Sequence, residues 1–174
     1  MKIKWCVALL ALGVASMAYA DLGLFYSYQD TKDMGAGSGG GLKYDIPLNR
    51  HVSVDARATI ITSYDVRQPT WTADIDMIPI ELNVNLKYPV ARMLPYIGGG
   101  VGYYYFHPSW MDEEIGYNIH AGVSVGIADG MDVFAEVKYQ FLEVDGSHTF
   151  LDKSERYKID ADGVGVIAGL LIRF

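Results

Sequence analysis

The chain has 174 residues, of which 51% are hydrophobic and 19 are glycine, and it carries 21 acidic against 14 basic residues. This acidic balance argues against a nucleic-acid-binding protein, because the phosphate backbone requires a basic surface. With Cys6 as its single cysteine, the chain cannot form an internal disulfide framework.

The first twenty residues have the composition of a secretory signal peptide. Lys2 and Lys4 give a basic start, an apolar run covers residues 7–14, and small residues flank a tyrosine at 18–20. The apolar run is shorter than the roughly 20 residues that a transmembrane helix needs. We predict cleavage before Asp21, which leaves one domain over residues 21–174 with a formal charge of −9.

After the signal, apolar residues recur with period two, which is the pattern of β-strands with two different faces. The clearest example is 75–88, where aliphatic residues hold the even positions from Ile78 to Leu86 and polar residues hold the odd positions from Glu81 to Lys87. Segments of this kind, each followed by a break, are typical of membrane barrels. The eight predicted strands are 22–28, 36–46, 51–64, 75–88, 94–106, 117–127, 132–145 and 162–174.

The breaks between these strands alternate between long and short. The long breaks are 29–35, 65–74, 107–116 and 146–160, and the short ones are 47–50, 89–93 and 128–131. With both termini in the periplasm, every long loop lies on the outer surface, as in outer-membrane barrels. An even number of strands also lets the last strand pair with the first. We therefore predict an all-β, eight-stranded antiparallel up-and-down transmembrane β-barrel.

Two stretches resemble a known family. The final strand, DGVGVIAGLLIRF, ends on Phe174 and resembles the closing strand of bacterial outer-membrane barrels. The stretch LPYIGGGVGYYYF at 94–106 resembles the central strand of the small outer-membrane β-barrel family, which includes the OmpA transmembrane domain and opacity-type surface proteins of the porin family. The resemblance implies a Gram-negative outer membrane with periplasmic termini. It also implies contact with membrane lipid and lipopolysaccharide, and recognition of the C-terminal strand by the barrel-assembly machinery.

Aromatic residues gather at both ends of the apolar face, which predicts two girdles at the membrane interfaces. The alternative is that tyrosine simply favours strands. The predicted girdle residues are Tyr44, Tyr88, Tyr103, Tyr105, Tyr117, Tyr139, Phe141 and Phe174.

By strand parity, five basic and five acidic residues face the bore. They are Lys43, Arg57, Lys87, Lys138 and Arg173 with Asp45, Asp55, Glu81, Asp132 and Glu136. Unpaired buried charges are costly, so this balanced set should pair. We predict that Arg57 meets Glu81 on the neighbouring strand, and that Lys138 meets Glu136, Glu81 or another inward acid. The central network would comprise Arg57, Glu81, Glu136, Lys138, Lys43 and Asp55.

An enzyme is not favoured. The best catalytic candidates are His120, Ser124 and Glu136, but His120 and Ser124 lie about 13 Å apart along one strand and face away from lipid. The remaining histidines have no ligand spacing around them, so no metal or cofactor is expected.

The long loops should carry any surface function. The loop 107–116 presents Trp110, Asp112, Glu113 and Glu114, and 146–160 mixes both charges. They could touch lipopolysaccharide through divalent cations or contact a host or envelope protein, or they could be solvated without a ligand. The sequence thus favours a structural or surface-interaction protein with a plugged, salt-bridged interior. The alternatives are a narrow channel for small solutes, a lipid-modifying enzyme, and a soluble lipocalin-like barrel with its apolar face inward.

Overall fold

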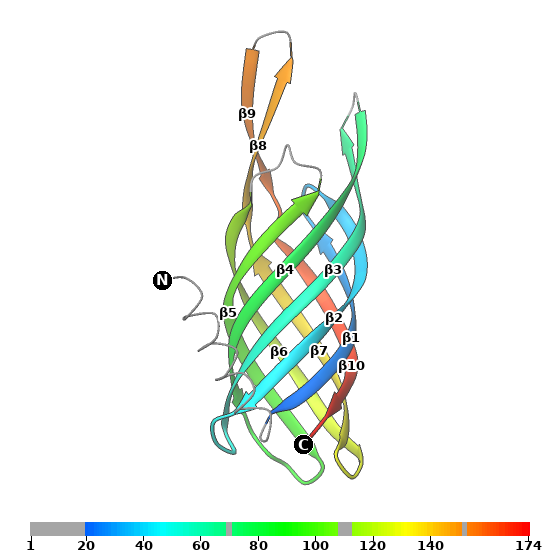
Figure 1. The fold of residues 1–174 in the computed structure, drawn as a ribbon, viewed down its shortest axis with the longest axis vertical. Coiled ribbons are helices and arrows are strands. Elements are labelled where there is room, and N and C mark those ends of the chain that lie inside the picture. Colours follow the sequence, from blue (N-terminus) through cyan, green and yellow to red (C-terminus); the bar gives the residue numbers. More distant parts are fainter. Residues whose placement is uncertain (1–19, 69–70, 108–112, 151–152) are drawn as a thin grey trace, which may run out of the picture.

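The computed structural model describes residues 20–68, 71–107, 113–150 and 153–174, with side chains described in 20–62, 76–107, 113–144 and 158–174. It is a closed antiparallel barrel with strand order β1-β10-β7-β6-β5-β4-β3-β2 (Figure 1). The barrel strands are β1 (Asp21–Thr31), β2 (Gly35–Pro47), β3 (Val52–Gln68), β4 (Trp71–Lys87), β5 (Met93–His107), β6 (Glu114–Ala128), β7 (Met131–Phe141) and β10 (Gly163–Ile172). In the described part of the chain, no helix has the length and apolar character needed to cross a membrane.

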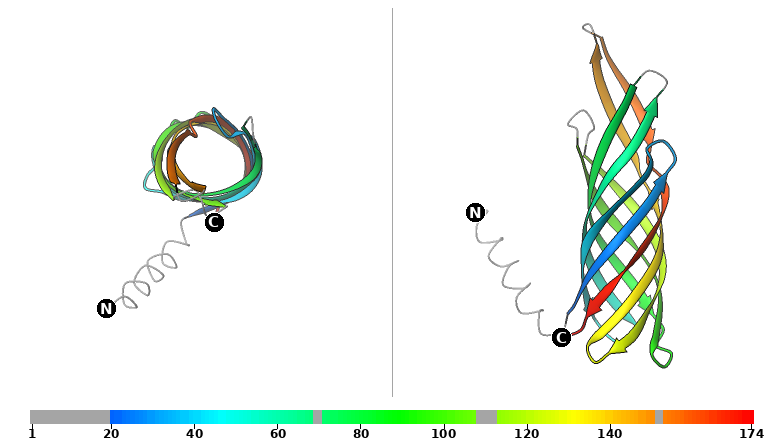
Figure 2. Two further views of the ribbon diagram at one scale, coloured as in Figure 1. Left: turned by 90° about the horizontal axis from the view of Figure 1, so that it is seen from above. Right: turned by 90° about the vertical axis from the view of Figure 1, so that its right-hand side faces the viewer.

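Pairing of the first strand with the last closes the barrel. β1 and β10 are antiparallel from the pair Leu22 and Ile172 to the pair Thr31 and Gly163. Viewed from above, the strands form a ring (Figure 2). Closure gives each barrel strand two neighbours, so no open sheet edge is left to face hydrocarbon. The predicted eight-stranded antiparallel barrel is confirmed.

The two faces of the strands have opposite environments. Leu24 and Leu82 point outward with 64% and 55% of their surface exposed, whereas Asp55 and Glu81 are buried in the bore. Thirty large hydrophobic residues are exposed on the described chain, and most of them lie on the outer face of the barrel strands. An apolar exterior around a polar interior suits a lipid environment. It is the reverse of a lipocalin-like barrel, and that alternative is wrong.

Two predicted loops are instead largely extended. β3 runs to Gln68 and β4 starts at Trp71, so most of 65–74 belongs to these strands. The break at 146–160 contains a separate hairpin of β8 (Glu143–Phe150) and β9 (Lys153–Asp160), and the seventh strand ends at Phe141. These stretches have no continuous apolar face in the sequence, because strands outside the bilayer need none. Periodicity therefore could not detect them.

The two ends of the barrel differ in shape. The three short turns lie at the end where β1 begins and β10 finishes, and the β3–β4 and β8–β9 hairpins project from the opposite end (Figure 1). We call these the turn end and the hairpin end. The alternation of short and long connections predicted this asymmetry.

The glycine run in β5 gives the bore room for polar side chains. A Cβ atom at Gly100 would collide with the carbonyl oxygen of Leu82 and with the side chain of Asn83 on β4. At Gly165 on β10, by contrast, a Cβ atom would make ordinary contacts, the shortest being 3.4 Å to the carbonyl oxygen of Tyr28. Two inward glycines of similar appearance in the sequence thus have different roles.

We predict that Gly100→Ala lowers the free energy of unfolding by about 1–3 kcal/mol, because the added methyl group overpacks the bore. The matched variant Gly165→Ala should leave it unchanged or raise it by about 0.4–1 kcal/mol through loss of unfolded-state entropy. Urea unfolding of the refolded protein in detergent micelles measures both. Equal effects of the two substitutions would contradict this assignment of Gly100.

Candidate functional site

The bore is crossed by an ion pair between opposite walls. Arg57 on β3 faces Glu136 on β7, and these strands lie four places apart in the ring of eight. Arg57 Nη2 donates to Glu136 Oε2 at 3.0 Å, and a second, shorter contact joins Nη1 to Oε1. Arg57 Nε donates to Asp55 Oδ1 at 2.7 Å. The guanidinium, which is 1% exposed, therefore lies between two carboxylates.

Lys43 on β2 completes this central group. Its Nζ lies 3.5 Å from Asp55 Oδ2 and 3.9 Å from Glu136 Oε2. The same ammonium lies 5.1 Å from the ring centroid of Tyr96 and 5.2 Å from that of Phe134, which is cation–π range. The Tyr96 hydroxyl donates to Glu136 Oε2 at 3.0 Å. Two cations and two carboxylates are thus neutralised within a cage that includes aromatic rings.

A second group surrounds Glu81. Lys138 Nζ lies 2.9 Å from Glu81 Oε1, and the Tyr104 hydroxyl donates to the same oxygen at 3.1 Å. The predicted meeting of Lys138 with Glu81, one of three options, is confirmed. The predicted pairing of Arg57 with Glu81 is wrong: the two residues are cross-strand partners in the register, but Arg57 reaches across the bore to Glu136.

The other four inward charges pair near the turn end. Lys87 contacts Asp45, and Arg173 Nη2 lies 2.8 Å from Asp132 Oδ1. All ten charged residues assigned to the bore by parity therefore have a partner of opposite sign. This leaves no uncompensated charge among them, as the cost of burial requires.

Amide side chains link these charges in a ring that sequence reasoning did not identify. Asn83 and Asn85 donate to the two oxygens of Asp55 at 2.9 and 2.6 Å. Asn118 donates to Asn83 Oδ1 at 2.9 Å, and the two His120 ring nitrogens lie 2.9 Å from Asn118 Oδ1 and 2.7 Å from Asn85 Oδ1. The detectable signal was the recurrence of asparagine at inward positions.

The candidate catalytic residues are occupied separately. His120 contacts asparagines, Ser124 donates to Asp132 Oδ2 at 3.0 Å, and Glu136 binds Arg57. No nucleophile and base come together among these three side chains. Among the described residues, no group of three histidine, cysteine or acidic side chains could hold a metal ion.

Above the ion pairs, an apolar cluster fills the hairpin end of the bore. We call it the cap, and it comprises Met34, Ile61, Met77, Tyr104, Leu142, Val144, Ile159 and Ala161. Each member is 7% exposed or less. Two of these residues lie in stretches predicted as loops, Met34 in 29–35 and Ile159 in 146–160, and Ala161 lies between the second loop and the last predicted strand. The sequence pattern therefore did not reveal the cluster.

A polar clasp ties the base of the hairpin to the turn after β1. Lys32 Nζ lies 2.9 Å from Asp160 Oδ2 and 3.2 Å from Asp162 Oδ2, and the Asp160 amide donates to Asp33 Oδ2 at 2.9 Å. The hydrogen bond from Lys32 holds the pKa of the Asp160 carboxyl below its usual range, and the two aspartates raise the pKa of Lys32. The Leu142 amide donates to Asp162 Oδ1 at 2.8 Å, which joins the clasp to the cap.

Six of the predicted girdle residues lie on the outer face of the strands, and Tyr88 and Phe174 follow the ends of β4 and β10. Tyr88, Tyr105, Tyr117, Phe141 and Phe174 are exposed, and Tyr44, Tyr103 and Tyr139 are half-buried. Their position at membrane interfaces stays a prediction.

Of the four surface residues predicted in 107–116, the structure describes Glu113 and Glu114. Trp110 and Asp112 lie outside the described residues. Glu113 is exposed and accepts a hydrogen bond from the Tyr103 hydroxyl at 2.5 Å, and Glu114 is half-buried at the start of β6.

A closed β-barrel with an apolar exterior and a charge-paired bore defines an integral outer-membrane barrel protein. Residues 6–174 match the family described as outer membrane protein beta-barrel domain, and the chain belongs to that family. It is therefore a small bacterial outer-membrane β-barrel protein with buried salt bridges in its interior.

Solved structures show the same fold. OprG from Pseudomonas aeruginosa aligns with a TM-score of 0.76 at 15% identity, covering 90% of this chain and 96% of that one. Neisserial surface protein A gives 0.65 at 14% identity, with 90% and 96% coverage. Ail of Yersinia pestis, solved in complex with the heparin analogue sucrose octasulfate, gives 0.53 at 16% identity, with 89% and 97% coverage. No curated protein sequence matches the chain significantly.

We predict that Glu81→Gln lowers the free energy of unfolding by about 3–5 kcal/mol, because Lys138 is left buried without its counter-ion. The double variant Glu81→Gln/Lys138→Met should recover part of this loss. Glu143→Gln is a control, since it removes a 3.0 Å pair with Lys158 on an exposed surface and should change little. Denaturant unfolding measures the set, and an equal loss in Glu81→Gln and Glu143→Gln would contradict the prediction.

We predict that the clasp weakens in acid. A carboxyl with a depressed pKa stabilises the folded state above its unfolded-state pKa, and this contribution disappears as the pH falls through the folded-state value. The pKa of Asp160 should therefore lie below the usual aspartate range in the native protein and rise in Lys32→Met, which lacks the hydrogen bond from Lys32. Carboxyl chemical shifts of Asp160, recorded by NMR against pH, test this. The same midpoint in both proteins would show that Lys32 does not hold Asp160.

Proposed function

We propose that this protein is a non-conducting barrel, without enzymatic activity, that acts through the segments projecting from its hairpin end, with both termini in the periplasm. The observation that supports this function best is the closure of the bore at two levels. The cap fills the hairpin end, and the ion pairs of Arg57 and Lys138 span the walls beneath it.

Physical dimensions favour a closed bore. Eight strands leave an interior just wide enough for side chains to fill. A cavity beneath the central group, bounded by Lys43, Asp45, Tyr96 and Ser124 among others, measures about 20 Å³, which is room for one water molecule. A permeating ion would have to separate Arg57 from Glu136 and displace the cap.

Charge distribution favours a role at the hairpin end. The connecting segments there, 30–35, 62–77, 107–116 and 142–162, contain fourteen acidic and five basic residues. Their net charge of −9 equals the formal charge of residues 21–174, because the bore and the turn end are each balanced. An acidic field of this kind attracts basic partners and repels polyanions.

This field suggests a partner with a basic surface. The Ail structure holds a sulfated heparin analogue, which is a polyanion. The acidic hairpin end of this chain disfavours such a ligand. Contacts between the acidic segments and lipopolysaccharide would then need bridging divalent cations. Chelation of these cations by EDTA should abolish such contacts but leave direct binding of a basic partner unchanged.

Single-channel recording in planar bilayers tests the closed bore. The native protein should show no stable openings, and Arg57→Ala/Glu136→Ala should also stay silent, because Asp55 and Lys43 remain paired and the cap is intact. Replacing 143–160 by a short Gly-Ser linker removes part of the cap. Only the combination of both changes should give openings. Stable openings in the native protein would contradict the closed-bore proposal and favour a narrow channel for small solutes.

The linker variant also tests the surface role. It should fold and insert normally but bind an oligolysine probe more weakly than the native protein at low salt, since replacement of 143–160 removes five acidic residues and three basic ones. Equal binding of oligolysine to both proteins, or strong binding of a heparin analogue, would contradict it.

A further inference from the structure

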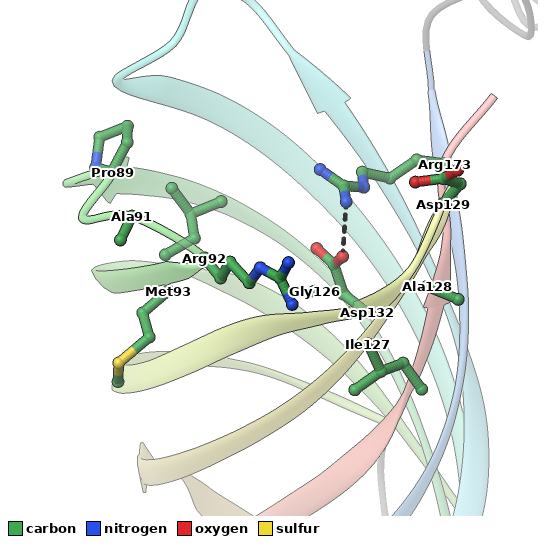
Figure 3. Close-up of a pocket in the computed structure, with 11 residues that line it drawn as sticks. Pro89, Ala91, Arg92, Met93, Gly126, Ile127, Ala128, Asp129, Asp132 and Arg173 are labelled. Carbon is green, nitrogen blue, oxygen red and sulfur yellow. Dashed lines mark ion pairs between the residues drawn. The ribbon is translucent and has the colours of Figure 1, made fainter.

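A hollow of about 580 Å³ lies at the turn end of the bore, between the turn after β4 and the turn after β6 (Figure 3). Its lining includes Arg92 from the first turn, Asp129 and Asp132 from the second turn and β7, and Arg173 from the end of β10. The volume falls within the range of small-molecule sites, roughly 300–1,000 Å³. The sequence analysis assigned no role to this combination of residues.

Backbone hydrogen bonds hold the walls of the hollow in place. The Gly126 amide donates to the Arg92 carbonyl at 3.1 Å, and the Arg173 amide donates to the Gly130 carbonyl at 2.8 Å. Val90 and Met93 exchange hydrogen bonds of 2.8 and 2.9 Å across the tight turn that contains Arg92. The two arginines therefore project from different, separately anchored elements.

Asp132 orients Arg173. The carboxylate is buried, its Oδ2 accepts the Ser124 hydroxyl at 3.0 Å, and its Oδ1 lies 2.8 Å from Arg173 Nη2. A guanidinium carries five N–H donors, so this single contact leaves most of them available. Figure 3 shows the Arg173 side chain extending toward Asp132, and the ion pair marked among the residues drawn joins these two side chains.

Arg92 approaches from the other side. Its exposed guanidinium is directed into the same space in Figure 3, where no ion pair joins it to another of the residues drawn. Formal charges in the lining balance, but Asp132 is already neutralised by Arg173. The hollow therefore presents unshared guanidinium donors, with Asp129 as the remaining acid on its rim.

We propose that this hollow is a binding site for an oxyanion, a carboxylate or phosphate group of a small molecule, held between Arg92 and Arg173. Arginine forks match the paired oxygens of these groups. On the proposed orientation the site opens to the periplasm, at the opposite end from the acidic hairpin segments. It is independent of the closed-bore proposal, because it needs no passage through the barrel.

Titration calorimetry of the refolded full chain in lipid nanodiscs at low salt tests the site, with inorganic phosphate and glutamate as probes. Arg92→Ala should weaken binding by about tenfold or more, as expected for loss of a charge-assisted hydrogen bond. Asp129→Asn should strengthen it by removing the nearby negative charge. Arg50→Ala is the matched control, because it removes one exposed arginine from another turn at the same end and should leave binding unchanged.

The two probes identify the source of the oxyanion. Tighter binding of phosphate would support a phosphorylated ligand, and tighter binding of glutamate would support a carboxylate ligand. Equal weakening by Arg92→Ala and Arg50→Ala would overturn the proposal, since it would show only a general charge effect. Failure of both probes to bind the native protein would overturn it as well.

Discussion

Saturation of backbone hydrogen bonds is the constraint on which the rest of this structure depends. In hydrocarbon an unpaired N–H or C=O group costs several kcal/mol, so the sheet has to close. Pairing of β1 with β10 achieves closure with eight strands. Eight strands in turn make the bore so narrow that inward side chains from all walls must pack against one another. Glycine at position 100 and the charge pairing of the interior both follow from that narrowness.

Ion pairs in such a bore are a condition of folding rather than a simple gain in stability. Burying a charge is costly, and a well-formed partner offsets that cost only in part. Here Arg57 is shared by Asp55 and Glu136, and amide side chains also donate to both oxygens of Asp55. Because Arg57 and Glu136 lie on opposite walls, their contact also links strands that are not neighbours in the sheet. The interior thus joins the walls that backbone pairing leaves separate.

The two ends of the barrel meet different surroundings and have different chemistry. At the hairpin end, the chain extends beyond the barrel, an apolar cap fills the bore, and the clasp of Lys32 with Asp160 and Asp162 holds the hairpin base above it. At the turn end, the turn after β4 and the end of β10 bring Arg92 and Arg173 around an open hollow. An acidic field on one side and guanidinium donors on the other would attract ligands of opposite charge, so the two ends are suited to different partners.

Local pattern in the sequence was sufficient for the eight barrel strands, their faces and the identity of the inward charges, but not for the β8–β9 hairpin. Period-two alternation depends only on neighbouring residues, which is why 75–88 could be read as a strand with Glu81 inside. The partners of those charges depended on tertiary structure, because distances across a bore are set by strand number and closure. Arg57 and Glu81 are adjacent in register, yet Arg57 binds Glu136 on the opposite wall. The same reason explains the cap and the turn-end hollow: Met34, Ile61 and Ile159, like Arg92 and Arg173, come together only when the sheet curves into a ring.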